Sequence, residues 1–174
     1  GDDAMVEEID GKSPVMGRGV FLAPTAVVIG DVEIGQGSSV WYNAVIRADR
    51  AAIRIGVNTN IQDNCTVHAD PPYPVTIGDH VSIGHNAVVH GATLEDGCLI
   101  GIGAIILNGA VVKTGSIVAP GAVVKQGRIV GPHHLVAGAP ASMKRVVDPE
   151  EAARNIENAQ TYVDLAGRYA KRAP

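Results

Sequence analysis

The sequence predicts an all-β fold, a parallel β-helix of six-residue repeats followed by one C-terminal α-helix. Three observations support this prediction. Aliphatic residues recur every six positions along most of the chain. The chain contains 21 glycines, and many of them directly follow one of those aliphatic residues. Aromatic residues make up only 3% of the chain, so the core must be narrow, regular and aliphatic.

The period of six begins near residue 28 and ends near residue 130. Its aliphatic positions are Val28, Ile34, Val40, Ile46, Ile55, Ile61, Val67, Ile77, Ile83, Val89, Leu94, Ile100, Ile106, Val112, Val118, Val124 and Val130. A period of six fits neither an α-helix nor a heptad repeat, and β-branched residues mixed with Gly are poor helix formers. Three repeats make one triangular coil, and coils stack about 4.8 Å apart through parallel hydrogen bonds.

The handedness of the coils does not follow from the period. Crossovers between parallel strands are usually right-handed, but proteins with this repeat pattern resemble a known left-handed exception. We therefore expect a left-handed β-helix.

Every third aliphatic position falls on the same face of the triangular prism. The first face holds Val28, Ile46, Val67, Val89 and Ile106; the second holds Ile34, Ile55, Ile77, Leu94 and Val112; the third holds Val40, Ile61, Ile83, Ile100 and Val118. Small residues suited to an interior corner follow four positions later, including both cysteines, Cys65 and Cys98. The two cysteines have no recognisable metal or redox spacing, so no disulfide framework is implied.

The pattern changes after Pro140. Asp148 followed by Pro149 predicts a helix start, with Glu151 closing a capping box. The helix should run to about Arg172 and lie along the prism through a stripe of Ile156, Ala159, Val163, Ala166 and Ala170. We expect one domain, in which residues 1–147 form a short N-terminal segment and the β-helix, and residues 148–174 form the packed helix.

Charge and hydropathy exclude several classes of partner. The net charge is −4, with 14 basic and 18 acidic residues and no basic tract, so nucleic acid is not an expected partner. No apolar run approaches the roughly 20 residues of a membrane span. The chain also lacks a signal-like start, and the expected location is the cytoplasm.

Three histidines occupy related positions in the repeat. His68 and His90 each follow the aliphatic residue of the first face, so they should be neighbours on adjacent coils. His85 lies on the third face, too far around the prism to meet them within one chain. A homotrimer could set the first face of one chain against the third face of the next. Three imidazoles with an open fourth position would make a catalytic zinc site.

The same ladders predict an ion pair between chains. Arg47 lies one coil below His68, and Asp63 lies one coil below His85. The two should therefore meet across the seam that brings the histidines together. Such a pair would fix the register of the interface beside the metal.

Four stretches resemble the gamma-class carbonic anhydrase family of trimeric left-handed β-helices. They are "VIRAD" at 45–49, "NIQDNCTVH" at 60–68, "IGHNAVVHG" at 83–91 and "VAGAPA" at 136–141. The resemblance covers nearly the whole chain. It implies reversible hydration of carbon dioxide to bicarbonate by a metal-bound hydroxide at the interface of a homotrimer.

The resemblance also implies roles for individual residues. It assigns His68, His85 and His90 as metal ligands and Gln62 as the residue that orients hydroxide or bicarbonate. Arg47 and Asp63 would form an intersubunit pair. Asp49 and Asn60 would belong to the supporting network, and Tyr162 would approach from the terminal helix. Zinc is the expected metal, and Fe(II) or Co(II) would also suit three imidazoles. The loop after the first histidine is shorter than in the family's prototype and offers only Asp70, while Arg50 replaces a glutamate.

Less specific readings of these residues are also open. Gln62 and Asp63 could be ordinary turn residues, and Tyr162 could simply pack the helix against the prism. His80, His133 and His134 have nothing converging on them, and we expect them to be surface residues.

Two other functions fit the fold. One is an acyl-CoA-dependent acyltransferase or thioesterase, for which Lys113, Lys125 and Arg128 could supply a basic cleft for the CoA phosphates. The other is a metal-binding scaffold with little or no turnover.

Overall fold

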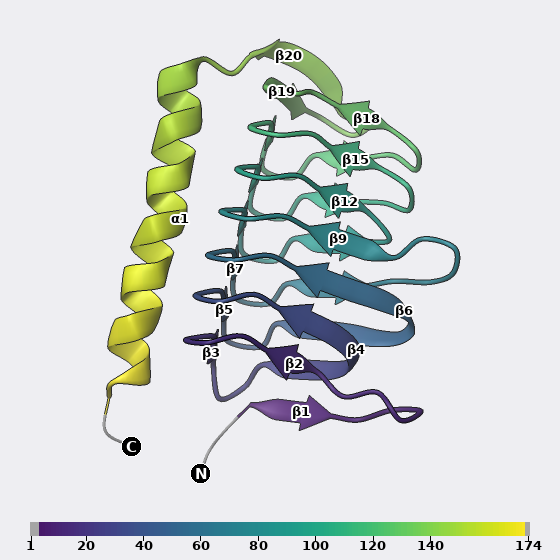
Figure 1. Cartoon of the computed structure of the whole chain (residues 1–174). Helices are drawn as coiled ribbons and strands as arrows, with labels where there is room; N and C mark the ends of the chain where they lie inside the picture. Colours follow the sequence, from purple (N-terminus) through teal and green to yellow (C-terminus); the bar gives the residue numbers. More distant parts are fainter. Residues whose placement is uncertain (1–3, 173–174) are drawn as a thin grey trace.

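The computed structural model describes residues 4–172. The expected ranges 1–147 and 148–174 therefore extend beyond the described residues at their outer ends. Short parallel strands stack into coils along one axis, and helix α1 (Pro149–Ala170) returns along the side of the stack (Figure 1). The predicted parallel β-helix with a C-terminal α-helix is confirmed.

Three groups of strands form the faces. The first face contains β1 (Met5–Glu7), β4 (Val27–Ile34), β6 (Val45–Ile55), β8 (Thr66–His68), β11 (Val88–His90), β14 (Ile105–Ile106) and β17 (Val123–Val124). The second contains β2 (Val15–Met16), the later parts of β4 and β6, β9 (Val75–Ile77), β12 (Thr93–Leu94), β15 (Val111–Val112) and β18 (Ile129–Val130). The third contains β3 (Phe21–Leu22), β5 (Ser39–Val40), β7 (Asn60–Ile61), β10 (Ser82–Ile83), β13 (Leu99–Ile100), β16 (Ile117–Val118), β19 (His134–Ala137) and β20 (Ser142–Val146).

The backbone register confirms the three predicted ladders. On the first face, Ile46 pairs with Val67 and Val67 pairs with Val89. On the second and third faces, each of the five predicted positions likewise pairs with the next one along the face. These aliphatic side chains are at most 5% exposed, so each coil buries its core against the coils above and below.

The small corner positions are buried as predicted. Cys65 and Cys98 are each 1% exposed and are free thiols. Burial raises the pKa of Cys65 to about 11 and that of Cys98 to about 12. Both therefore behave as small apolar residues of the core.

The corner after the third face is built from residues with left-handed backbone. Asn64 and Asn86 have φ values of 64° and 63°, and Gly103 has 70°. Their N–H groups donate to the carbonyl oxygens of Tyr42, Asp63 and His85 in turn. This confirms that His85 stands in a ladder with Tyr42 and Asp63, separate from the ladder of His68 and His90.

Helix α1 begins as predicted, but its first turn differs in one respect. The Asp148 carboxylate accepts a hydrogen bond from the N–H of Glu151 at 2.9 Å, as an N-cap should. Glu151 does not close a capping box. Its carboxylate instead accepts two hydrogen bonds from Arg145, at 2.7 and 2.9 Å, because β20 brings this guanidinium beside the helix start.

The predicted helix stripe is also partly wrong. Ala159 and Ala166 are buried as expected, but Ile156 is 44% exposed and Ala170 is exposed. The helix face that packs includes Tyr162 and Tyr169, whose rings contact Trp41 on the third face. Ile156 still lies over Gly97, and the aromatic pairs with Trp41 add a contact that the predicted stripe omitted.

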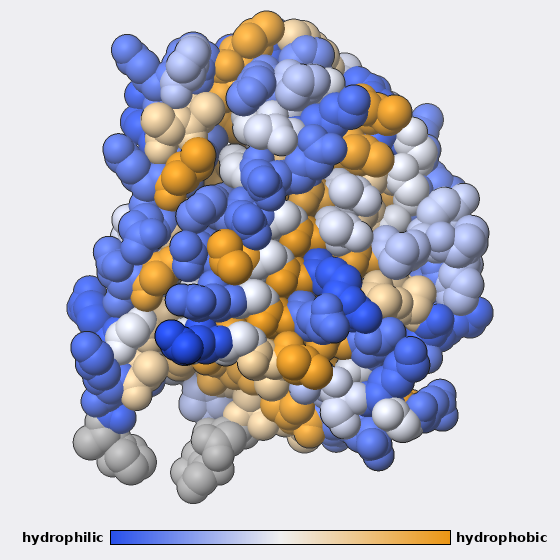
Figure 2. All heavy atoms as spheres, viewed as in Figure 1, coloured by the Kyte–Doolittle hydropathy of each residue, from blue (hydrophilic) through white to orange (hydrophobic). Residues whose placement is uncertain are grey.

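The outer surface of α1 is mainly hydrophilic in Figure 2, and apolar residues gather on the coils beside it. Within residues 4–172, no helix is both long and apolar enough to cross a membrane.

Candidate metal centre

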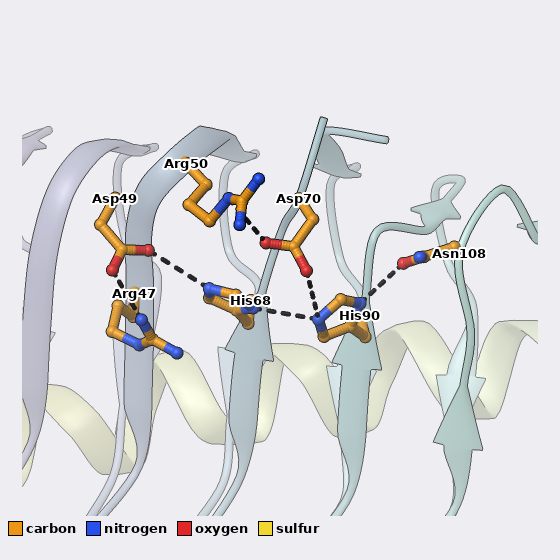
Figure 3. A network of polar contacts seen from close by, with 7 residues as sticks. All are labelled: Arg47, Asp49, Arg50, His68, Asp70, His90 and Asn108. Carbon is orange, nitrogen blue, oxygen red and sulfur yellow. Dashed lines mark hydrogen bonds and ion pairs between the residues drawn. The ribbon is translucent and has the colours of Figure 1, made fainter. Parts of the chain in front are cut away.

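The first face brings two histidines into direct contact. His68 ends strand β8 and His90 ends β11, and the two residues are paired in the parallel register. His68 Nδ1 lies 3.0 Å from His90 Nε2, and the ring centroids are 5.0 Å apart. Figure 3 shows the rings turned toward each other on neighbouring strands. The predicted vertical pair is confirmed.

The outer nitrogens of these rings are held by oxygen acceptors. His68 Nε2 lies 3.2 Å from Asp49 Oδ1, and His90 Nδ1 lies 2.6 Å from Asn108 Oδ1. A carboxylate and an amide oxygen can only accept, so the proton of each ring belongs on its outer nitrogen. The inner nitrogens then present lone pairs to each other.

Two lone pairs at 3.0 Å repel each other unless a proton or a metal ion lies between them. Neutral imidazole with its second nitrogen donating to a carboxylate or carbonyl is the usual state of a metal-binding histidine. The donor set and its outer hydrogen bonds therefore fit a transition metal such as zinc.

Asp70 is a third donor beside the pair. Its Oδ2 lies 3.6 Å from His90 Nε2, and its Oδ1 lies 3.3 Å from Arg50 Nε. One donor atom each from His68, Asp70 and His90 lies within 4.8 Å of the others. The sequence pointed to Asp70 only as the acidic residue of a short loop.

Asp49 connects the histidines to Arg47. Arg47 Nη1 lies 2.6 Å from Asp49 Oδ2. Partial burial alone would raise the pKa of Asp49, but hydrogen bonds from Arg47 and His68 outweigh it and lower that pKa. Asp49 is therefore an anion that can hold the His68 proton, in agreement with a supporting role.

His85 lies on the third-face corner, apart from this group. Its Nδ1 is 3.0 Å from Asp63 Oδ1, and its side chain is 43% exposed. Within the single chain, Arg47 and Asp63 thus each have a partner other than the predicted one. Their pairing between chains stays a prediction, as does the convergence of His85 on His68 and His90.

Gln62 and Asn60 belong to a buried polar chain on the third face. Gln62 Nε2 donates to Asn60 Oδ1 at 3.0 Å, and Asn60 Nδ2 donates to Ser82 Oγ at 2.9 Å. Gln62 is 7% exposed and Asn60 is 1% exposed. These hydrogen bonds fix the orientation of the Gln62 amide.

Tyr162 packs edge-on against Trp41, with ring centroids 5.6 Å apart. Burial raises the pKa of its phenol, and the charge of Asp63 adds to this effect. The ring therefore stays protonated at neutral pH. In the single chain its contacts are those of a packing residue.

Comparison with known proteins extends this description. Residues 13–48 match the family model "Bacterial transferase hexapeptide (six repeats)", and residues 74–108 and 93–126 match "Hexapeptide repeat of succinyl-transferase". A protein of Methanocaldococcus jannaschii named "Probable carbonic anhydrase" is 56% identical over 87% of this chain and 96% of its own length. "Gamma carbonic anhydrase 2, mitochondrial" of Arabidopsis thaliana is 43% identical over 91% of this chain, which spans 59% of that protein.

This chain belongs to the gamma-class carbonic anhydrase family. A solved structure of a hexapeptide transferase family protein from Anaplasma phagocytophilum has a TM-score of 0.91 and 37% identity over 95% of this chain and 98% of that one. Gamma-class chains and hexapeptide transferases therefore share this coil architecture, and the site has to distinguish their functions.

Asn108 was not predicted from the sequence to be part of the site. The pair Asn108-Gly109 reads as an ordinary turn. The Asn108 side chain can reach His90 only because residue 91 is a glycine: a Cβ at this position would collide with the Asn108 amide. Ser82 was missed as well. Its signal was available, because Ser82 pairs with Asn60 in the third-face register.

The remaining polar candidates lie elsewhere on this gamma-class fold. His80 and His133 are corner residues with positive φ, and His134 begins β19. Lys113 is half-buried, whereas Lys125 and Arg128 are exposed, and Arg128 donates to the carbonyl of Ala141.

Proposed function

We propose that this protein is a metal-dependent carbonic anhydrase that interconverts carbon dioxide and bicarbonate. Membership of the gamma-class family supports the proposal. The observation that carries it is the facing pair of inner nitrogens on His68 and His90, whose outer nitrogens are held by Asp49 and Asn108. That arrangement is suited to metal binding.

We propose that the working form is a homotrimer. His68 and His90 of one chain would hold the metal together with His85 of its neighbour, and Arg47 would pair with Asp63 across the same seam. When bound, zinc, or Fe(II) or Co(II) in its place, supplies hydroxide near neutral pH by lowering the pKa of water to about 7.

The chain's own residues then orient the reactants. Since Gln62 Nε2 donates to Asn60, the carbonyl oxygen of the same amide remains to accept a hydrogen bond from hydroxide or bicarbonate. Asn60, itself held by Ser82, fixes that orientation. Asp49 and Asn108 keep the two rings in the tautomers that bind metal.

The direct test is stopped-flow hydration of carbon dioxide by zinc-loaded and anaerobically Fe(II)-loaded protein. His90→Ala serves as the control because it removes one inner nitrogen. We expect activity in the wild type and none above background in the variant. Equal rates for the two proteins, both folded and the wild type metal-replete, would refute the proposal.

The rival functions would give a different result in the same preparations. The transferase family models favour acyl transfer as the second candidate. Release of free thiol from acetyl-CoA, without hydration of carbon dioxide, would support it. Stoichiometric metal with neither activity would instead support a scaffold.

A further inference from the structure

Asp70 occupies a position that the roles described so far do not explain. The half of the site on the first face contains three donors from one chain, His68, Asp70 and His90. His85 is not among them. A chain that has not yet met its neighbour therefore presents a complete set of three possible ligands.

We infer that Asp70 is a metal ligand within the single chain, and that His68, Asp70 and His90 capture the metal before a neighbouring chain supplies His85. This inference rests on the proposed function. It assigns Asp70 a role in metal loading and leaves the histidine site of the assembled enzyme unchanged.

The spacing of the three donors supports this role. Ligand atoms about 2.05 Å from a tetrahedral zinc ion lie roughly 3.3 Å apart. The observed separations are 3.0 Å between His68 Nδ1 and His90 Nε2 and 3.6 Å between His90 Nε2 and Asp70 Oδ2. All three donor atoms lie within 4.8 Å of one another, so side-chain movements alone would bring them to the spacing of zinc ligands.

The backbone around Asp70 fixes the loop that carries this carboxylate. Asp70 and Tyr73 form a tight bridge in which Tyr73 N donates to Asp70 O at 2.8 Å. Tyr73 in turn lies over Gly91 and Gly109, where an added Cβ would approach it to 2.9 and 3.1 Å. The loop is thus packed on the coil that carries His90.

Arg50 leaves one carboxylate oxygen available. It pairs with Oδ1, while Oδ2 faces His90 (Figure 3). Ligating carboxylates are commonly held in this way through their second oxygen. The Arg50 and Asp70 side chains are 64% and 37% exposed, so their ion pair contributes little to folding stability. Its loss should not unfold the chain.

The test uses the His85→Ala protein, in which the interface histidine is absent, with and without Asp70→Asn. Zinc affinity is measured by competition with a chromophoric chelator, and Co(II) absorption reports the coordination. We expect His85→Ala to keep one metal site per chain. Adding Asp70→Asn should weaken that site by at least about tenfold, as expected for the loss of a group from a metal site.

Two controls separate ligation from loss of the ion pair or of charge. Arg50→Gln removes the pair but keeps the carboxylate, and Glu150→Gln removes an exposed carboxylate at the far start of α1. In the His85→Ala background, Glu150→Gln should leave zinc affinity within about twofold, because it removes neither a ligand nor a residue that holds one. Arg50→Gln should weaken zinc binding less than Asp70→Asn does, because the carboxylate remains although its second oxygen loses its partner.

The outcomes also separate this inference from the proposed function. If His85→Ala binds no metal, or binds it equally well with Asp70→Asn, the inference is overturned while the wild type can still be an anhydrase. If the wild type itself binds neither zinc nor Fe(II) nor Co(II), the proposed function fails, and the inference fails with it.

Discussion

The first and third faces of this prism carry histidines at similar heights in very different surroundings. His68 and His90 are 12% and 27% exposed, lie at the ends of paired strands, and have a partner for every ring nitrogen. His85 is 43% exposed and stands on a corner beside Asp63. The first face presents an ordered cluster of donors, and the third face displays a single histidine outward.

The difference follows from the repeat. Residues at strand ends inherit the fixed spacing of the ladder, so two histidines one coil apart must meet. His85 stands instead at a corner position whose side chain is 43% exposed and faces outward. The third-face corner can therefore contribute to the ordered cluster only in a second molecule, which is the reason to expect a shared centre.

Removal of the metal should have the largest effect, because it eliminates the hydroxide on which hydration depends. After dialysis against a strong chelator, we expect stopped-flow hydration to fall to the uncatalysed rate. The far-ultraviolet circular dichroism should stay unchanged, because the aliphatic ladders hold the coils together. Readdition of zinc should restore activity. Full activity in metal-free protein would contradict the assignment.

Asn108→Ala should disturb only the ordered cluster of donors. Without an acceptor for its Nδ1 proton, His90 loses its fixed tautomer, and zinc affinity should fall about 10- to 100-fold. Chelator competition measures this change. Asn108→Asp keeps an oxygen acceptor and should bind zinc nearly as well as the wild type. Equal weakening in both variants would indicate a purely steric role.

Gly91→Ala tests how closely the same cluster is packed. Gly91 has a φ of 63°, and an added Cβ would meet the Asn108 side chain and Tyr73. Positive φ costs about 1–2 kcal/mol for alanine, and crowding adds about 1–3 kcal/mol. Gly127→Ala is the matched control, with a φ of 73° and open space. Urea unfolding should show the larger loss of stability for Gly91→Ala; equal losses would refute the crowding.

Arg145→Gln should have the smallest effect, at the helix start far from either histidine ladder. A hydrogen bond from Arg145 lowers the pKa of Glu151. A carboxyl with a lowered pKa stabilises the fold above its unfolded pKa and loses that contribution as the pH falls. The variant should therefore melt slightly below the wild type at pH 7 and together with it at about pH 3. A difference that grows in acid would contradict this linkage.

The sequence was sufficient for the ladders, because a period of six determines which residues share a face. On that basis His68 and His90 could be predicted to be neighbours. His85, two residues after Ile83, could be placed on a different face. The packed face of α1 could not be predicted in this way. It depends on Tyr162 and Tyr169 meeting Trp41, a tertiary contact with no repeat behind it.

The groups around the histidines were only partly predictable. Asn108 and Asp70 lie in turns, where the six-residue phase no longer fixes side-chain direction. Asn108 reaches His90 across a glycine, and Asp70 is positioned by Tyr73. Such contacts depend on the packing of one particular loop, so they appear only in the three-dimensional structure.

The central claim is that each metal centre needs two chains, and complementation tests it most directly. His68→Ala and His85→Ala should each be inactive alone. When the two are co-expressed, a site with His68 and His90 from one chain and His85 from the other can form, and random mixing would restore on the order of a quarter of the sites. His68→Ala with His90→Ala should restore nothing, because both residues must come from the same chain. Recovery in the first mixture alone is the predicted result; no recovery in soluble mixed trimers would contradict the shared site.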